Sequence, residues 1–178
     1  MSGRLPAPTY LCRLALLALF ATVSVAVAAP TAQDYINGFV LYVRWPDDAH
    51  IRSWQVCTSA TANDIDAGYA ARQVRDRPFV VRHLKNGEAL DGCQILDLTG
   101  TDTAAVAALL KAAQARQGLL TVGSGRDFCS AGGMICLLPQ EPRGGFEVNL
   151  SAIKSSQLAI NARLLMMARQ GASEGAPP

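Results

Sequence analysis

The chain has 178 residues, of which 50% are hydrophobic and 17% are charged, and these values are typical of a single globular domain. Sixteen basic and 14 acidic residues give a net charge of +2, with no cluster of Lys and Arg. Nucleic-acid binding normally requires a basic patch, so this balance excludes nucleic acid as an expected partner.

The first residues have the pattern of a secretory leader. Arg4 and Arg13 precede an almost wholly apolar run over 14–29, and Ala26 and Ala28 offer the small side chains that a signal peptidase reads. The run is shorter than the roughly 20 residues that span a bilayer, so a cleaved signal peptide over 1–28 is expected rather than a membrane anchor. Its removal takes away two basic residues and no acid, which leaves a mature chain without net charge. This chain comprises a domain over 29–170 and a tail over 171–178 that we expect to be disordered.

Four cysteines remain after the leader: Cys57, Cys93, Cys129 and Cys136. An even number in an exported chain predicts two disulfides, and four cysteines permit three pairings. Cys129 and Cys136 bracket only six residues, two of them glycine, so this short loop can close on itself. The residues alone leave the other pairings open.

The remaining elements are predicted from periodicity and turn residues. In chain order we expect a helix over 31–44 that ends before Pro46, a strand over 53–59, a helix over 65–71, strands over 78–84 and 94–98, a helix over 103–116, a strand over 119–122, a Gly-rich loop over 123–133, strands over 134–138 and 146–150, and a helix over 151–169 broken near Asn161. This alternation predicts an α/β fold, a single three-layer domain whose central, mostly parallel sheet ends in a C-terminal antiparallel hairpin and is flanked by helices.

We find no pattern that indicates catalysis, a metal or a cofactor. His50 and His83 are far in sequence from any cysteine and have no triad context, and there is no Cys-x-x-Cys. The stretch 123–125 lacks the third glycine of a dinucleotide fingerprint, so we interpret it as a turn. We therefore expect no catalytic residue, no metal and no cofactor, and binding becomes the default function.

Several stretches together resemble the YfiR family in order and spacing. They are 39–46, the strand with Cys57, 92–96, 119–122, Phe128, 132–135, 146–150 and 162–165, and the resemblance covers nearly all of 34–169. It implies a periplasmic α/β domain, a homodimer, that binds the periplasmic part of a membrane-bound diguanylate cyclase, represses it and so lowers cyclic di-GMP. It also implies release by an outer-membrane lipoprotein, and disulfides that pair Cys57 with Cys93 and Cys129 with Cys136.

The same resemblance implies a partner-facing region around the last strand. Carried over to this chain, the region includes Leu137, Phe146, Glu147 and Ile153. Strand alternation independently turns Glu147 away from Phe146, Val148 and Leu150, which we expect to face the core. A solvated Glu147 and ordinary helix packing of Ile153 are the alternatives.

Two other functions compete with this one. A periplasmic sensor subunit that binds a small ligand and serves another receptor, such as a histidine kinase, is the main alternative, because many members of the family accompany other membrane receptors. An exported enzyme is disfavoured by the lack of a catalytic motif.

Overall fold

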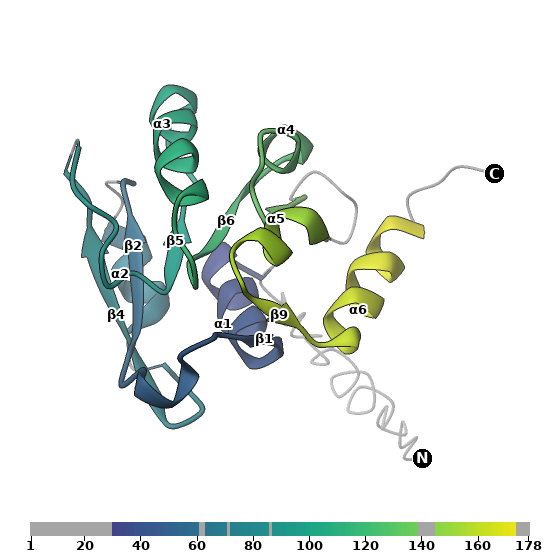
Figure 1. Ribbon diagram of the computed structural model, residues 1–178, viewed down its shortest axis with the longest axis horizontal. Coiled ribbons are helices and arrows are strands. Elements are labelled where there is room, and N and C mark those ends of the chain that lie inside the picture. The colour runs from purple at the N-terminus through teal and green to yellow at the C-terminus, as the bar shows by residue number, and fades with distance from the viewer. Residues whose placement is uncertain (1–29, 61–62, 71, 86, 139–144, 174–178) are drawn as a thin grey trace, which may run out of the picture.

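The computed structural model describes residues 30–173, except 61–62, 71, 86 and 139–144 (Figure 1). The expected signal peptide over 1–28 therefore lies outside the described residues. Of the expected tail over 171–178, only 171–173 are described, and they form the end of the last helix.

A seven-stranded sheet in the order β3-β4-β2-β5-β6-β7-β8 forms the centre of the domain. Strands β2 and β4 are parallel, as are β2 and β5, β5 and β6, and β6 and β7, whereas β3–β4 and β7–β8 are antiparallel pairs at the two edges. The predicted α/β class, with its mostly parallel sheet and C-terminal hairpin, is confirmed. The strands are β2 (Trp54–Thr58), β3 (Gln73–Val74), β4 (Arg77–His83), β5 (Ile95–Asp97), β6 (Leu120–Ser124), β7 (Ile135–Leu137) and β8 (Phe146–Val148).

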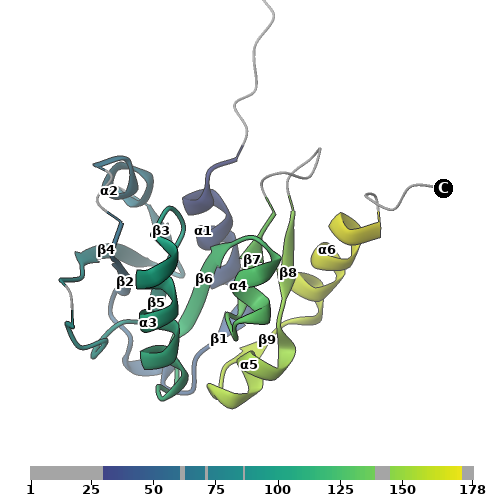
Figure 2. The ribbon, with the colours of Figure 1, turned by 90° about the horizontal axis from the view of Figure 1, so that it is seen from above.

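Helices cover both faces of this sheet and make the three layers (Figure 2). On one face lie α1 (Ala32–Tyr42), α2 (Asn63–Tyr69) and α6 (Ala162–Ser173), and on the other lie α3 (Thr103–Gln114) and α4 (Arg126–Ser130). Because successive residues of a strand point to opposite faces, each central strand supplies both layers. Ile95 packs into the apolar cluster under α1, and its neighbour Leu96 packs into the cluster under α3.

Helix α1 begins and ends close to its predicted limits. A capping box closes its first turn, because the Thr31 hydroxyl accepts from the Asp34 N–H and the Asp34 carboxylate accepts from the Thr31 N–H. The helix ends when the chain becomes extended at Val43, where β1 (Val43–Arg44) pairs with β9 (Ala159–Ile160) in a separate two-stranded sheet. A single 3-10 turn, η1 (Asp48–His50), follows.

The expected helix over 151–169 is wrong in its first half. The chain forms α5 (Leu150–Ser155), then β9, and only then α6. Gln157 has a φ of 60°, which no helix accommodates, so the break expected near Asn161 is longer and starts earlier. The expected loop over 123–133 also contains the short helix α4.

The hairpin β3–β4 was not predicted either. Its two-residue turn, Arg75 and Asp76, has φ values of 55° and 59°, the positive values that a type I′ turn requires. Asn-Gly is the usual sequence for this turn, so Arg-Asp carries little signal. The Arg75 guanidinium donates to the carbonyl oxygens of Leu41 and Val43, which stabilises the turn against the end of α1.

Candidate functional site

The first disulfide joins Cys57 of β2 to Cys93, two residues before β5, with 5.8 Å between the Cα atoms. That separation is ordinary for a disulfide. Both cysteines are buried in the apolar cluster under α3. The bridge therefore fastens the end of the long β4–β5 connection to the middle of the sheet.

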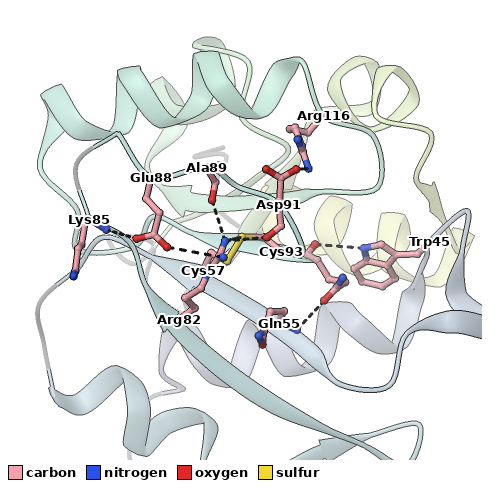
Figure 3. Close-up of a disulfide and its surroundings, with 11 residues drawn as sticks. Trp45, Gln55, Cys57, Arg82, Lys85, Glu88, Ala89, Asp91, Cys93 and Arg116 are labelled. Atoms are coloured by element: carbon pink, nitrogen blue, oxygen red, sulfur yellow. Dashed lines mark hydrogen bonds and ion pairs between the residues drawn. A yellow bond between two sulfur atoms is a disulfide. The ribbon is translucent and has the colours of Figure 1, made fainter.

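Arg82 of β4 holds the same connection from the other side (Figure 3). Its guanidinium donates to the carbonyl oxygens of Ala89 and Asp91, each at 3.1 Å, and lies 2.9 Å from the Cys93 sulfur. Glu88 is 3.9 Å away and balances the charge. A single partly buried arginine thus orders the segment that leads into the disulfide.

Beside this disulfide lies a cavity of about 490 Å³, at the ends where β2, β5 and β6 begin. The residues that line it come from three connections: 45–53 before β2, 92–94 before β5 and 116–118 before β6. Gln55 of β2 also lines the cavity, beside Gln94. This site was not predicted from the sequence, because its parts are far apart along the chain and no motif connects them.

The second disulfide joins Cys129 of α4 to Cys136 of β7, again with 5.8 Å between the Cα atoms. The pairing implied by the family resemblance is therefore the one in the structure. Phe128, the neighbour of Cys129, packs so closely on Gly123 and Gly133 that a Cβ atom at either glycine would lie within 2.5 Å of the ring. These glycines let α4 lie flat on the sheet, and the disulfide keeps it there.

Glu147 stands on β8 directly opposite Cys136 of β7 and on the same face of the sheet as α4. Its carboxylate accepts from the Arg126 guanidinium of α4 at 2.8 Å, and 35% of its side chain is exposed. Asn149, just after β8, donates from its side chain to the Cys129 carbonyl oxygen. The outward orientation predicted for Glu147 is thus present, and this carboxylate also ties α4 to the edge strand.

The other three predicted partner-facing residues lie inside the domain. Leu137, Phe146 and Ile153 are buried in the apolar cluster under α1, and the Phe146 ring meets the Phe39 ring edge to face at 4.8 Å. Leu137 and Phe146 pair across β7 and β8. Their side chains can therefore shape a surface at Glu147 from beneath, whereas direct contact with a partner would require the core to open.

The expectation that Leu150 faces the core is wrong. The strand ends at Val148, and the Asn149 side chain then caps α5 by accepting from the Ala152 N–H at 3.1 Å. Leu150 falls at the start of this helix and is 45% exposed. Strand alternation fails here because the strand is two residues shorter than expected.

One buried carboxylate was also missed. Asp97, at the end of β5, accepts from the Tyr69 hydroxyl at 3.0 Å and from the Thr99 hydroxyl at 2.6 Å. Burial raises the pKa of Asp97, and it raises the pKa of the Tyr69 hydroxyl as well. The available sequence signal was a single acidic residue inside the otherwise apolar run 95–98. In the structure, the hydrogen bond between this residue and Tyr69 joins β5 to α2.

The described acidic side chains and histidines lie apart from one another or in isolated pairs. No group of three or more His, Cys, Asp or Glu side chains that could hold a metal occurs in the described part of the chain. His50 and His83 are exposed and pair with Asp47 and Asp66. The described groups provide a disulfide-braced frame, a polar cavity and the charged surface at Glu147.

Comparison with known proteins identifies the family to which this chain belongs. The sequence profile described as YfiR/HmsC-like matches residues 31–169, so the chain is a member of the YfiR/HmsC-like family, a family of periplasmic regulatory proteins. No curated protein matches the chain. The two disulfides fit the oxidising compartment in which the family occurs. Among the described helices, none is long and apolar enough to cross a membrane.

Proposed function

We propose that this protein is exported with cleavage after Ala28 and represses a membrane-bound diguanylate cyclase by binding the periplasmic part of that enzyme. Membership of the family and the two disulfides support this proposal. The observation that carries it is the position of Glu147, a partly exposed carboxylate fixed by Arg126 on the edge strand β8.

The surface that we assign to the partner combines charge with apolar area. The exposed Leu150 follows Glu147 by three residues along the chain. Arg126 pairs with Glu147 and has 59% of its side chain exposed. A fixed charge beside an apolar residue suits a protein interface, because charge complementarity gives specificity while the apolar contact gives affinity. Leu137, Phe146 and Ile153 act in this proposal as the buried support of that surface.

The test is Glu147→Lys in a strain that lacks the gene. We expect the variant to accumulate in the periplasm as the wild type does but to leave cyclic di-GMP as high as in the deletion strain. A charge reversal at a surface position changes the free energy of unfolding by less than about 1 kcal/mol, whereas like charges at an interface cost several.

Asp66→Lys is the matched control. Asp66 lies on α2, near the opposite edge of the sheet, and also has one charged partner, His83. It should restore low cyclic di-GMP as fully as the wild type. If Glu147→Lys restores it equally well, Glu147 is only solvated. If the wild-type gene itself does not change cyclic di-GMP, the cyclase is not the partner.

The family resemblance also supports a homodimer and release of repression by an outer-membrane lipoprotein, which we include in the proposal. Sedimentation of the purified mature protein measures the first. Co-purification with such a lipoprotein, compared between wild type and Glu147→Lys, measures the second.

A sensor subunit for another receptor, such as a histidine kinase, is the second candidate. The cavity of about 490 Å³ favours it, since its volume falls within the range of small-molecule sites. An adjacent gene for a membrane protein with a cyclase domain would favour the first function, and one for a histidine kinase would favour the second.

A further inference from the structure

The cavity beside the first disulfide has a wall that is already fixed without a ligand. The Trp45 indole N–H donates to the Gln94 carbonyl oxygen at 3.3 Å, and the Gln94 side chain accepts from the Gln55 N–H at 3.0 Å (Figure 3). Trp45 also packs on Trp54, with ring centroids 4.8 Å apart. A preformed wall lowers the cost of ordering the site when a molecule binds.

Two guanidinium groups line this cavity. Arg116 is held by Asp91 at 2.5 Å, whereas Arg52 has no ion-pair partner anywhere in the described residues. Asp47 is the single carboxylate among the lining residues, and it is paired with His50. The lining thus presents one guanidinium group without an ion-pair partner among the described residues and a second that is positioned by an ion pair with Asp91.

The lining also has an apolar part and an unpaired acceptor. Pro46 and Ile51 offer apolar surface next to Arg52. The Gln55 side-chain oxygen is buried and, within the described residues, has no hydrogen-bond donor. A buried acceptor without a partner is costly, so a ligand N–H or O–H within reach of this amide would be favoured.

We propose that this cavity binds a small organic anion. Its carboxylate or phosphate group meets the guanidinium groups of Arg52 and Arg116, and its apolar body lies against Pro46 and Ile51. The site is separate from the Glu147 surface, so this inference does not depend on which membrane protein is regulated.

The experiment is calorimetric titration of the oxidised mature protein with three probes: benzoate, phenyl phosphate and the neutral benzyl alcohol. We expect at least one of the two anions to bind with a Kd of about 1 mM or tighter, as suits ligands of this size, and benzyl alcohol to bind at least about tenfold more weakly. Which anion binds distinguishes a carboxylate ligand from a phosphate ligand.

Arg52→Gln and Arg116→Gln should each weaken that binding about tenfold or more, because each removes a charge-assisted hydrogen bond. Arg163→Gln, the same change at an exposed position on α6, is the control and should leave the Kd within about twofold. Arg52 has no ion pair among the described residues, so Arg52→Gln should not disturb the fold. If Arg116→Gln unfolds the protein, the affinity of Arg52→Gln for the anion tests the proposal alone. Absence of binding by both anions, equal binding of benzyl alcohol, or equal weakening by Arg163→Gln would overturn the proposal.

Discussion

Among single residues, Asp97 shows most clearly how burial among apolar side chains changes the properties of a polar group. Asp97 is enclosed by the core, and its hydrogen bonds with Tyr69 and Thr99 lower its pKa less than burial raises it. The native state therefore holds a proton on this carboxyl more tightly than the unfolded chain does. Over the pH range between the unfolded pKa and the raised native pKa of Asp97, each unit of increase in pH therefore lowers the free energy of unfolding.

This gives a prediction for Asp97→Asn, a variant that cannot ionise at this position. The free energy of unfolding of the wild type, relative to the variant, should fall as the pH rises from about 4, where the unfolded Asp begins to ionise. Urea denaturation of both proteins at several pH values measures the difference. A difference that rises or stays flat over this range would contradict the assignment.

At the candidate site, the sequence predicts only those features that depend on neighbours along the chain. Strand alternation predicted that Glu147 points away from the core, because that depends only on its neighbours along the chain. Its contact with Arg126 could not be predicted, since it depends on where α4 lies on the sheet. The cavity was missed for the same reason, as Arg52, Gln94 and Arg116 come from three separate connections.

At the scale of elements, local signals succeeded where an element is long and failed where it is short. The capped helix α1 and the buried strands β2 and β6 have enough residues to show a period or a continuous apolar run. β1, β3 and β9 have two residues each and exist only because a partner strand lies beside them. For β1 and β9 the partner is more than 100 residues away along the chain, and no pattern within two residues can reveal it. For β3 the partner is close, but the Arg75-Asp76 turn carries little signal.

The cap of α1 carries a prediction of its own. Hydrogen bonds from the Thr31 backbone N–H and hydroxyl and from Arg72 lower the pKa of Asp34 to about 2. Because the native pKa is lowered, the associated stability is present above the unfolded value of 3.8 and is lost as the pH falls toward 2.

Thr31→Ala should therefore lower the free energy of unfolding by about 1 kcal/mol at neutral pH and raise the pKa of Asp34 toward its ordinary value. Thr103→Ala is the control, because the N-cap of α3 is Asp102 and Thr103 lies one position inside the helix. Denaturant unfolding and NMR titration of the Asp34 carboxyl measure both effects. Equal losses in the two variants would mean that the capping box contributes nothing specific.

For the molecule as a whole, the two disulfides restrict the unfolded chain to different extents. Cys57 and Cys93 are 36 residues apart and Cys129 and Cys136 are seven apart. In the chain-entropy model the longer loop stabilises by about 4 kcal/mol and the shorter by about 2.5 kcal/mol.

Replacing both cysteines of the first bridge by alanine should therefore lower the thermal midpoint more than the same replacement of the second. All four side chains lie at or near the apolar cluster under α3, so the cost of lost packing is similar in the two double variants. Scanning calorimetry at one pH compares them. If the loss of Cys129–Cys136 lowered the thermal midpoint more, the attachment of α4 to the sheet would contribute more stability than loop entropy does.

The pairing of β1 with β9 connects the beginning of the described chain to its end, and it has a consequence for maturation. In the export that we propose, the chain enters the periplasm from its N-terminus, and β1 cannot pair until β9 has followed, 115 or more residues later. Folding must therefore wait for translocation to finish, while the cysteines are exposed in the order in which they emerge. Because each bridge joins consecutive cysteines, an oxidase that links each newly arrived thiol to the one before it makes only native bonds. This protein should accordingly mature at the normal rate in cells that lack a disulfide isomerase.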